Sequence, residues 1–185
     1  MKIIVFGTLG MLCAGCMGPA NKIKPVAGFE VDRYLGTWYE IVRFPHVFEK
    51  DLINVTAEYG KGKKGRITVT NKGQREQTGE WTSIQGYATM ASKDGSADLR
   101  VVFFWPFRGV YRVVALDTEE YRYALVISSN FDYLWILSRT PSLDQEIVNH
   151  LLGQAKEMGF DLSKVIHVKQ THCPIQTDPT PTPGP

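Results

Sequence analysis

The sequence predicts an all-β fold, an eight-stranded antiparallel up-and-down barrel with one C-terminal α-helix packed outside and a short final strand. Two observations lead to this class. Eight segments that alternate apolar and polar residues follow one another, separated by short, turn-rich connections. No helix-sized segment lies between them, which excludes the crossovers that parallel strands need. A chain of 185 residues, 43% apolar and 22% charged, is long enough to bury one such core.

The eight predicted strands are bounded by turn signals such as the glycine-rich segment 60–65. They cover residues 38–44, 53–60, 66–72, 82–92, 99–105, 110–116, 123–128 and 133–138. Successive side chains of a strand point to opposite faces, so the apolar set of each strand defines one inner face. Eight antiparallel strands can close into a barrel whose interior holds one small ligand.

A helix is expected after the strands. Ser142 is its predicted cap, and Gln145 three residues later completes a capping-box pattern. Apolar residues recur at helical spacing as far as Gly159, which is expected to end the helix. The opposite face carries acidic residues, which favours packing on the barrel over binding to a membrane surface. Residues 165–169 are the predicted final strand.

The two ends of the chain differ from its body. Residues 1–15 have the basic start, short apolar run and small residues of a secretory signal. The tripeptide Ala14-Gly15-Cys16 resembles a bacterial lipobox, so Cys16 is the expected lipidation site and the outer membrane, on its periplasmic side, the expected location. Plain secretion with Cys16 as an ordinary thiol is the alternative. Residues 16–28 are then a tether, 29–172 the folded domain and 173–185 a disordered proline-rich tail.

Composition excludes several function classes. A net charge of +2 gives no basis for binding nucleic acid. The four histidines have no metal-ligand spacing, and no cysteine lies in a predicted strand to act as a nucleophile. The sequence therefore predicts no enzyme, no cofactor and no metal site. If Cys16 is acylated, Cys173 is left unpaired within its own chain and could link two chains.

Two motifs carry a family resemblance. Residues 34–41, Tyr-Leu-Gly-Thr-Trp-Tyr-Glu-Ile, resemble the Gly-x-Trp signature of the lipocalins, and residues 134–141 resemble their late arginine motif. The resemblance extends over roughly residues 28 to 170 and is nearest to the lipoprotein lipocalins of bacterial outer membranes. It implies a ligand-carrying barrel, and it leaves a noncovalent homodimer open.

The same motifs predict how one end of the barrel is closed. Trp38 begins the first strand and Arg139 follows the eighth, and these strands are neighbours in a closed barrel. The Arg139 guanidinium can lie on the Trp38 indole in a cation–π contact worth about 0.5–2 kcal/mol. Gly36, Trp38 and Arg139 are thus the predicted structural plug. Glu40 shares the parity of Trp38 and would need a partner such as an arginine inside.

Alternation selects the residues expected to line the lumen. They are Val55, Ala57, Tyr59, Val69, Met90, Val101, Phe103, Tyr111, Val113, Tyr133 and Trp135. The loops after strands one, three, five and seven lie opposite the plug. They form a mouth with exposed aromatic residues, namely Phe44, Phe48, Trp105, Phe107 and Phe131.

An apolar lumen with an apolar mouth suits a lipid with one long acyl chain. The predicted ligand is a fatty acid or a lysophospholipid, stored or transported at the outer membrane. Lys72, Arg75 and Arg108 are the candidates for contact with an acidic head group. Two alternatives stay open: a different small hydrophobic ligand, and a structural or interaction lipoprotein whose barrel binds nothing.

Overall fold

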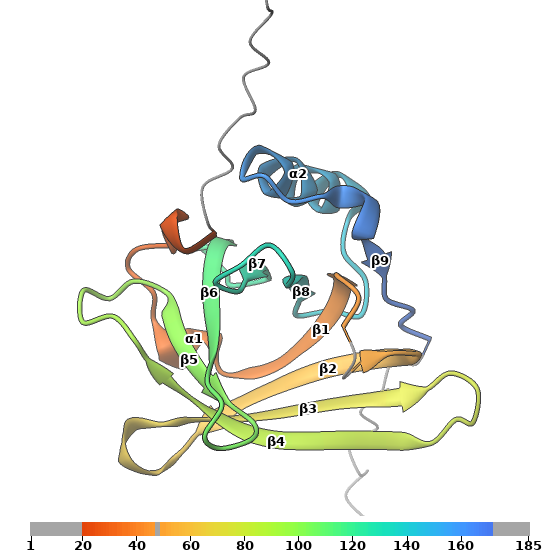
Figure 1. Ribbon diagram of the computed structural model, residues 1–185, viewed down its shortest axis with the longest axis horizontal. Helices are drawn as coiled ribbons and strands as arrows, with labels where there is room; N and C mark the ends of the chain where they lie inside the picture. Colours follow the sequence, from red (N-terminus) through yellow and green to blue (C-terminus); the bar gives the residue numbers. More distant parts are fainter. Residues whose placement is uncertain (1–19, 47–48, 172–185) are drawn as a thin grey trace, which may run out of the picture.

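The computed structural model describes residues 20–46 and 49–171 (Figure 1). Nine strands appear in these residues: β1 (Gly36–Arg43), β2 (Leu52–Lys61), β3 (Ile67–Arg75), β4 (Trp81–Met90), β5 (Asp98–Val102), β6 (Gly109–Leu116), β7 (Tyr123–Ile127), β8 (Leu134–Ser138) and β9 (Ile166–His167). The helices are α1 (Val31–Tyr34) and α2 (Gln145–Glu157), with 3-10 turns η1 (Ala20–Lys22), η3 (Lys63–Gly65) and η4 (Leu162–Lys164).

The strands form one closed antiparallel barrel. Each strand from β2 to β7 pairs with the next one in the sequence, and β1 pairs with both β8 and β2, which closes the ring. The register sets Gly36 of β1 opposite Tyr59 of β2, and Arg43 opposite Trp135 of β8. β9 adds to β1 outside the ring. The predicted fold class, eight strands in a barrel with one helix and a short final strand, is confirmed.

A bulge in β1 changes which of its side chains face inward. Between Glu40 and Val42 the strand contains one more residue than the facing stretch of β8. A bulge of this kind shifts the alternation for every residue after it. Trp38 and Glu40 before the bulge and Arg43 after it therefore all face the interior, whereas Val42 packs outside.

The end of the folded chain fills a gap between β1 and β2 near the mouth. These strands pair only from Gly36 to Tyr39 on the β1 side. Beyond that point the Gln170 Nε2 donates hydrogen bonds of 2.9 Å to the carbonyls of both Glu40 and Val55. The backbone N–H of Asn54 donates to Lys169 O at 2.8 Å. Residues 166–171 thus tie the two parting strands together.

Two apolar cores lie on the two sides of the sheet. The inner core fills the barrel around Trp38, Val69, Val113 and Leu137. The outer core lies between α2 and the outward faces of β1, β7 and β8, where Leu151 is 1% exposed. The apolar stripe of α2 packs on the barrel, as expected (Figure 1).

The start of α2 differs from the prediction. Asp144, not Ser142, is the N-cap, and its carboxylate accepts a hydrogen bond of 2.7 Å from Glu146 N. Gln145 is the first helical residue and completes no capping box. Two acceptable cap residues stand close together in the sequence, and the local pattern alone does not distinguish them. Gly159 follows the helix with φ 98°, as a helix-ending glycine should.

The segment expected to be a tether is partly folded. Ala20 is fully buried, and Arg112 donates hydrogen bonds to the carbonyls of Ala20 and Ile23 at 3.3 and 3.1 Å. The backbone N–H of Val26 bonds to Val113 O at 2.9 Å. Residues 20–28 therefore lie against the barrel wall and are not a free tether.

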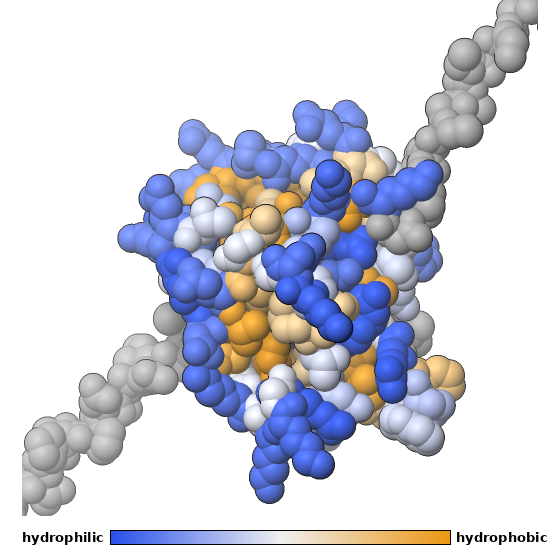
Figure 2. All heavy atoms as spheres, turned by 90° about the vertical axis from the view of Figure 1, so that its left-hand side faces the viewer, coloured by the Kyte–Doolittle hydropathy of each residue, from blue (hydrophilic) through white to orange (hydrophobic). Residues whose placement is uncertain are grey.

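The surface carries the polar residues that the strand alternation predicted. Seen from the left-hand side of Figure 1, hydrophilic side chains make up most of the outline and hydrophobic ones show between them in the middle of the face (Figure 2). Within residues 20–46 and 49–171, no helix is long and apolar enough to cross a membrane.

Candidate ligand-binding site

The closed end of the barrel is built around Arg139. Its guanidinium carbon lies 4.0 Å from the centre of the Trp38 ring. The same group donates three hydrogen bonds to backbone carbonyls, from Nη1 to Thr37 at 3.0 Å, from Nη2 to Arg33 at 2.7 Å and from Nε to Tyr121 at 3.2 Å. One side chain therefore joins β1, α1 and the β6–β7 connection. The contact between Trp38 and Arg139 has the geometry expected from the two motifs.

Gly36 completes this closed end. Its φ is 95°, in the left-handed region that disfavours a side chain, and an added Cβ would lie 3.4 Å from the Arg139 Nη1. Trp38, fully buried, donates from its indole N–H to Tyr34 O at 2.8 Å. The Gly-x-Trp motif thus places a glycine that Arg139 can approach closely two residues before a buried indole ring.

Three tyrosines form a floor just inside the closed end. The Tyr111 hydroxyl lies 2.7 Å from that of Tyr34 and 2.8 Å from that of Tyr59, so the three share one hydrogen-bonded chain. Burial is the main cause that raises the pKa of all three phenols, which are therefore neutral. Tyr59 and Tyr111, predicted to line the lumen, lie in this floor.

The middle of the interior is apolar. Seven more of the predicted lining residues belong to the inner core or pack against it: Ala57, Val69, Met90, Val101, Phe103, Val113 and Trp135. Val55 is 4% exposed and lies against Gly73 of β3, and Tyr133 stacks on Trp135 with ring centres 5.8 Å apart. The structure gathers these residues on the inner side of the barrel; their contact with a ligand stays a prediction.

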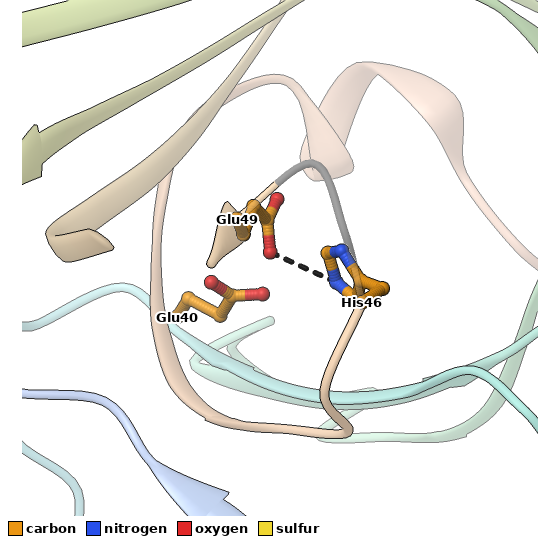
Figure 3. A group of neighbouring side chains, drawn as sticks. All are labelled: Glu40, His46 and Glu49. Carbon is orange, nitrogen blue, oxygen red and sulfur yellow. Dashed lines mark ion pairs between the residues drawn. The ribbon is translucent and has the colours of Figure 1, made fainter. Parts of the chain in front are cut away.

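A buried ionic cluster lies at the mouth end of this apolar space. Glu40 of β1 lies beside His46 and Glu49 of the β1–β2 connection (Figure 3). Arg43 also belongs to β1. The Arg43 guanidinium lies 3.8 Å from the Glu40 carboxylate and 3.9 Å from that of Glu49, and it donates to Glu49 O at 2.6 Å. His46 Nε2 lies 3.0 Å from the Glu49 carboxylate. The arginine that an inward Glu40 required is Arg43.

The pKa values of the two carboxyl groups in this cluster are shifted in opposite directions. Desolvation, followed by the neighbouring Glu49 charge, raises the pKa of Glu40 well above its usual range. Burial also acts to raise the pKa of Glu49, but the hydrogen bond and charge of His46 outweigh it and leave that pKa lowered. Of the two carboxyl groups, Glu40 therefore holds a proton more readily and Glu49 loses its proton more readily.

The donor atoms of Glu40, His46 and Glu49 lie within 4.8 Å of one another, a spacing that can hold a metal ion. Arg43, however, contacts both carboxylates and already supplies the positive charge. A divalent cation would have to share this space with a guanidinium, which the repulsion of like charges opposes. The donor set fits an ion-pair cluster better than a metal centre.

The predicted aromatic mouth is only partly correct. Phe44 is fully buried outside the barrel and meets Phe160 edge-on at 5.9 Å. Phe131 packs on Phe160 as well, at 4.9 Å. Trp105 and Phe107, by contrast, are 78% and 77% exposed. Phe48, Cys16 and Cys173 lie outside the described residues.

The predicted head-group cations do not lie inside. Lys72 pairs with Glu58 at 3.9 Å on the outer surface, and Arg75 and Arg108 are exposed. The buried Arg43 was missed, because strict alternation gives residues 40 and 43 opposite faces. Only the bulge in β1 brings both inside. The remaining signal in the sequence is a charged or imidazole residue at every third position from 40 to 49.

A closed eight-stranded barrel with a Gly-x-Trp and arginine plug and an apolar interior defines a lipocalin-type binding protein. Residues 29–170 match the lipocalin-like domain family, and the chain belongs to it. Membership assigns the chain to binding and transport proteins, and the prediction that it is not an enzyme is confirmed on this ground.

The most informative relatives are bacterial. The chain is 42% identical over 170 residues to the outer membrane lipoprotein Blc of Vibrio cholerae, covering 92% of this chain and 99% of the relative. It is 43% identical over 172 residues to Blc of Escherichia coli K12, covering 92% and 97%. The chain is accordingly an outer-membrane lipoprotein of the lipocalin family, and the predicted location is confirmed.

Distant members share the fold. Bovine apolipoprotein D is 36% identical over 154 residues, covering 79% of each chain. The structure of insecticyanin from the tobacco hornworm superposes with a TM-score of 0.65 at 24% identity, covering 80% of this chain and 84% of that one. The latter likeness supports the barrel fold alone.

Proposed function

We propose that this lipocalin binds a fatty acid or a lysophospholipid reversibly and stores or transports it at the outer membrane, to which an acylated Cys16 attaches the chain. The observation that carries the proposal is the layered interior. A hydrogen-bonded tyrosine floor closes one end, an apolar wall follows, and a buried cation lies toward the mouth. This order matches a molecule with an apolar tail and an anionic head.

Tail burial supplies the affinity. Each CH₂ group removed from water contributes about 0.8 kcal/mol, so a dozen contribute about 10 kcal/mol before the cost of lost motion. Met90, Phe103 and Trp135 are partly buried residues of the inner face that can pack against such a tail. The tyrosine floor sets the depth that the tail can reach.

Arg43 replaces the surface cations as the proposed head-group contact. Its side chain is 5% exposed, and its Nε and Nη1 have ion-pair neighbours at 3.8–3.9 Å but no hydrogen-bond acceptor within the described residues. A carboxylate or phosphate can accept two parallel hydrogen bonds from a guanidinium. An anionic head would approach the side of Arg43 next to Glu40, because the raised pKa of Glu40 favours its uncharged form.

The test fills the lumen. Ala57→Trp adds a large ring to the inner face of β2 and is expected to weaken oleate and lysophosphatidylcholine binding at least tenfold, about 1.4 kcal/mol, by calorimetry. Thr56→Trp places the same ring on the outer face of β2 and should leave the affinity within twofold.

In the parent, Trp135 fluorescence should change saturably with oleate, and Trp135→Phe should remove most of that change.

A separate measurement tests the contact with the head group. Oleyl alcohol has the same tail as oleate without the charge, and the parent should bind it at least tenfold more weakly. If Ala57→Trp folds normally and binds as tightly as the parent, the tail does not lie in the barrel. If no saturable binding of either lipid occurs, the chain carries another hydrophobic ligand or serves as a structural lipoprotein.

A further inference from the structure

The connection between β5 and β6 forms an aromatic turn at the mouth. Phe107 N donates a hydrogen bond of 2.8 Å to Phe104 O, which makes Trp105 and Pro106 the central residues of a tight turn. Phe104, Trp105 and Phe107 are 57%, 78% and 77% exposed. None of the three rings stacks on another aromatic ring in the part of the chain that the structure describes. We call residues 104–107 the aromatic turn.

The base of this turn is fixed on the barrel. Gly86 of β4 lies so close to β5 that an added Cβ would stand 2.3 Å from Val102 O and 2.8 Å from the Phe103 ring. Phe103 packs against the inner core, whereas the next residue, Phe104, is exposed. The aromatic turn therefore projects from a rigid edge where the inner wall of the lumen passes directly into the outer surface.

Water is a poor solvent for such a surface. Contiguous exposed apolar residues on a soluble domain mark a site for a protein, a ligand or a membrane. Tryptophan beside phenylalanine, with a flanking arginine such as Arg108, is the composition that favours the boundary between lipid and water. The chain resides at the outer membrane. A lipid surface is thus always near this turn.

We propose that the aromatic turn inserts into the outer-membrane leaflet and holds the mouth of the barrel against the lipid. Arg108 then lies at the level of the phosphates, and the apolar surface from Trp105 through Phe103 is continuous into the lumen. A ligand can leave the leaflet along that surface without crossing water. The proposal holds for any membrane-derived apolar ligand and does not depend on the head group.

Two reporter variants of the full chain, purified from membranes with its anchor, test the location. Trp81→Phe with Trp135→Phe leaves Trp105 and the buried Trp38; adding Trp105→Phe and Lys93→Trp to these two changes leaves a tryptophan at position 93 and Trp38. Position 93 is a suitable control, because it is exposed but belongs to the β4–β5 connection, at the end of the barrel opposite the mouth. In phosphatidylethanolamine–phosphatidylglycerol vesicles, lipids brominated in the acyl chain should quench Trp105 at least twofold more than the tryptophan introduced at position 93.

Equal quenching of the two reporters would overturn the proposal. So would a blue shift of Trp105 emission that grows with protein concentration in the absence of vesicles, because a second copy of the chain would then cover the turn. If vesicles leave the Trp105 emission unchanged, the proposal is overturned as well.

Ligand transfer gives a second measurement. Replacing Phe104, Trp105 and Phe107 by serine should slow the transfer of cis-parinaric acid from vesicles to the protein at least fivefold, while its equilibrium affinity in solution stays within twofold. Lys93→Ser, at the opposite end of the barrel, should change neither. An unchanged transfer rate in the triple variant refutes the membrane contact. Absence of probe binding to the parent refutes the proposed lumen function instead and leaves the quenching result standing.

Discussion

Arg139 shows how a single side chain can hold one end of a barrel. Its guanidinium covers the Trp38 ring at 4.0 Å and donates to three carbonyls of separate segments. A lysine would retain the charge but not the planar fork that reaches all three acceptors. The stabilisation therefore comes mainly from hydrogen bonds in a fixed geometry.

Arg139→Met is accordingly expected to lower the free energy of unfolding by about 2–4 kcal/mol, because carbonyls lose charged donors and the ring contact is lost. Urea unfolding with an unchanged m-value measures this loss. Arg66→Met is the matched control. Arg66 lies 4.2 Å over the Tyr87 ring at an exposed position, so about 0.5–1 kcal/mol is expected there. Equal losses for the two variants would show that the carbonyl bonds contribute nothing.

Glu40 predicts a pH dependence of stability. Its pKa is raised in the folded state by burial, so the folded chain binds this proton more tightly than the unfolded chain. The corresponding stabilisation is complete below the unfolded pKa of about 4.3 and is lost as the pH rises through the folded pKa. Glu40→Gln keeps the neutral form, so its stability relative to the parent should increase between pH 4 and pH 7.

The measurement is the free energy of unfolding of both proteins across that range. The gain should exceed the 0.5 kcal/mol or so typical of surface changes. A constant difference for Glu40→Gln would mean that Glu40 titrates as an ordinary surface carboxyl.

Individual contacts were predictable where they depend on strand neighbours. The ends of the first and last strands of a closed barrel must meet, so Trp38 and Arg139 could be paired from the sequence alone. The partner of Glu40 could not be found in this way. One extra residue in β1 reverses the facing of Arg43, and the alternation of the sequence contains no mark of that insertion.

At the scale of elements, α2 gives the clearest test of local sequence signals. Asp144→Ala removes the acceptor for Glu146 N and should cost about 1 kcal/mol in urea unfolding. Ser142→Ala, the cap that the sequence pattern favoured, should stay within about 0.5 kcal/mol of the parent. If Ser142→Ala lowers the stability more than Asp144→Ala does, the helix begins with the capping box that the sequence pattern predicted.

All eight predicted barrel strands are present, because period-two alternation with glycine turns is a strong local signal. Their ends were less predictable. The fifth strand was expected to reach Trp105 but ends at Val102, since residues 104–107 form a turn whose rings look like strand residues. Phe44 was expected at the mouth but lies beneath α2. Its burial depends on a helix a hundred residues away.

For the whole molecule, the order of the layers was predictable and the packing of the chain ends was not. Counting connections from the plug correctly separates closed end from mouth. Segment 20–28 is short and interrupted by Pro25 and Gly28, so its sequence resembles a linker. In the structure, Ala20, Ile23 and Val26 pack in the two apolar cores. Backbone hydrogen bonds and the Arg112 guanidinium also hold the segment, and backbone carbonyls accept such bonds whatever the side chains are.

The tie between β1 and β2 has a kinetic consequence. Gln170 bonds to carbonyls 130 and 115 residues earlier in the chain, and β1 pairs with β8 about as remotely. Contacts between such distant residues form slowly, because the intervening chain must first lose its freedom. The ring cannot close before β8, which ends at Ser138, is available, and the gap between β1 and β2 is tied only when residues 166–171 arrive. A chain exported from its N-terminus is therefore expected to complete its barrel wall last, with the residues that leave the ribosome last.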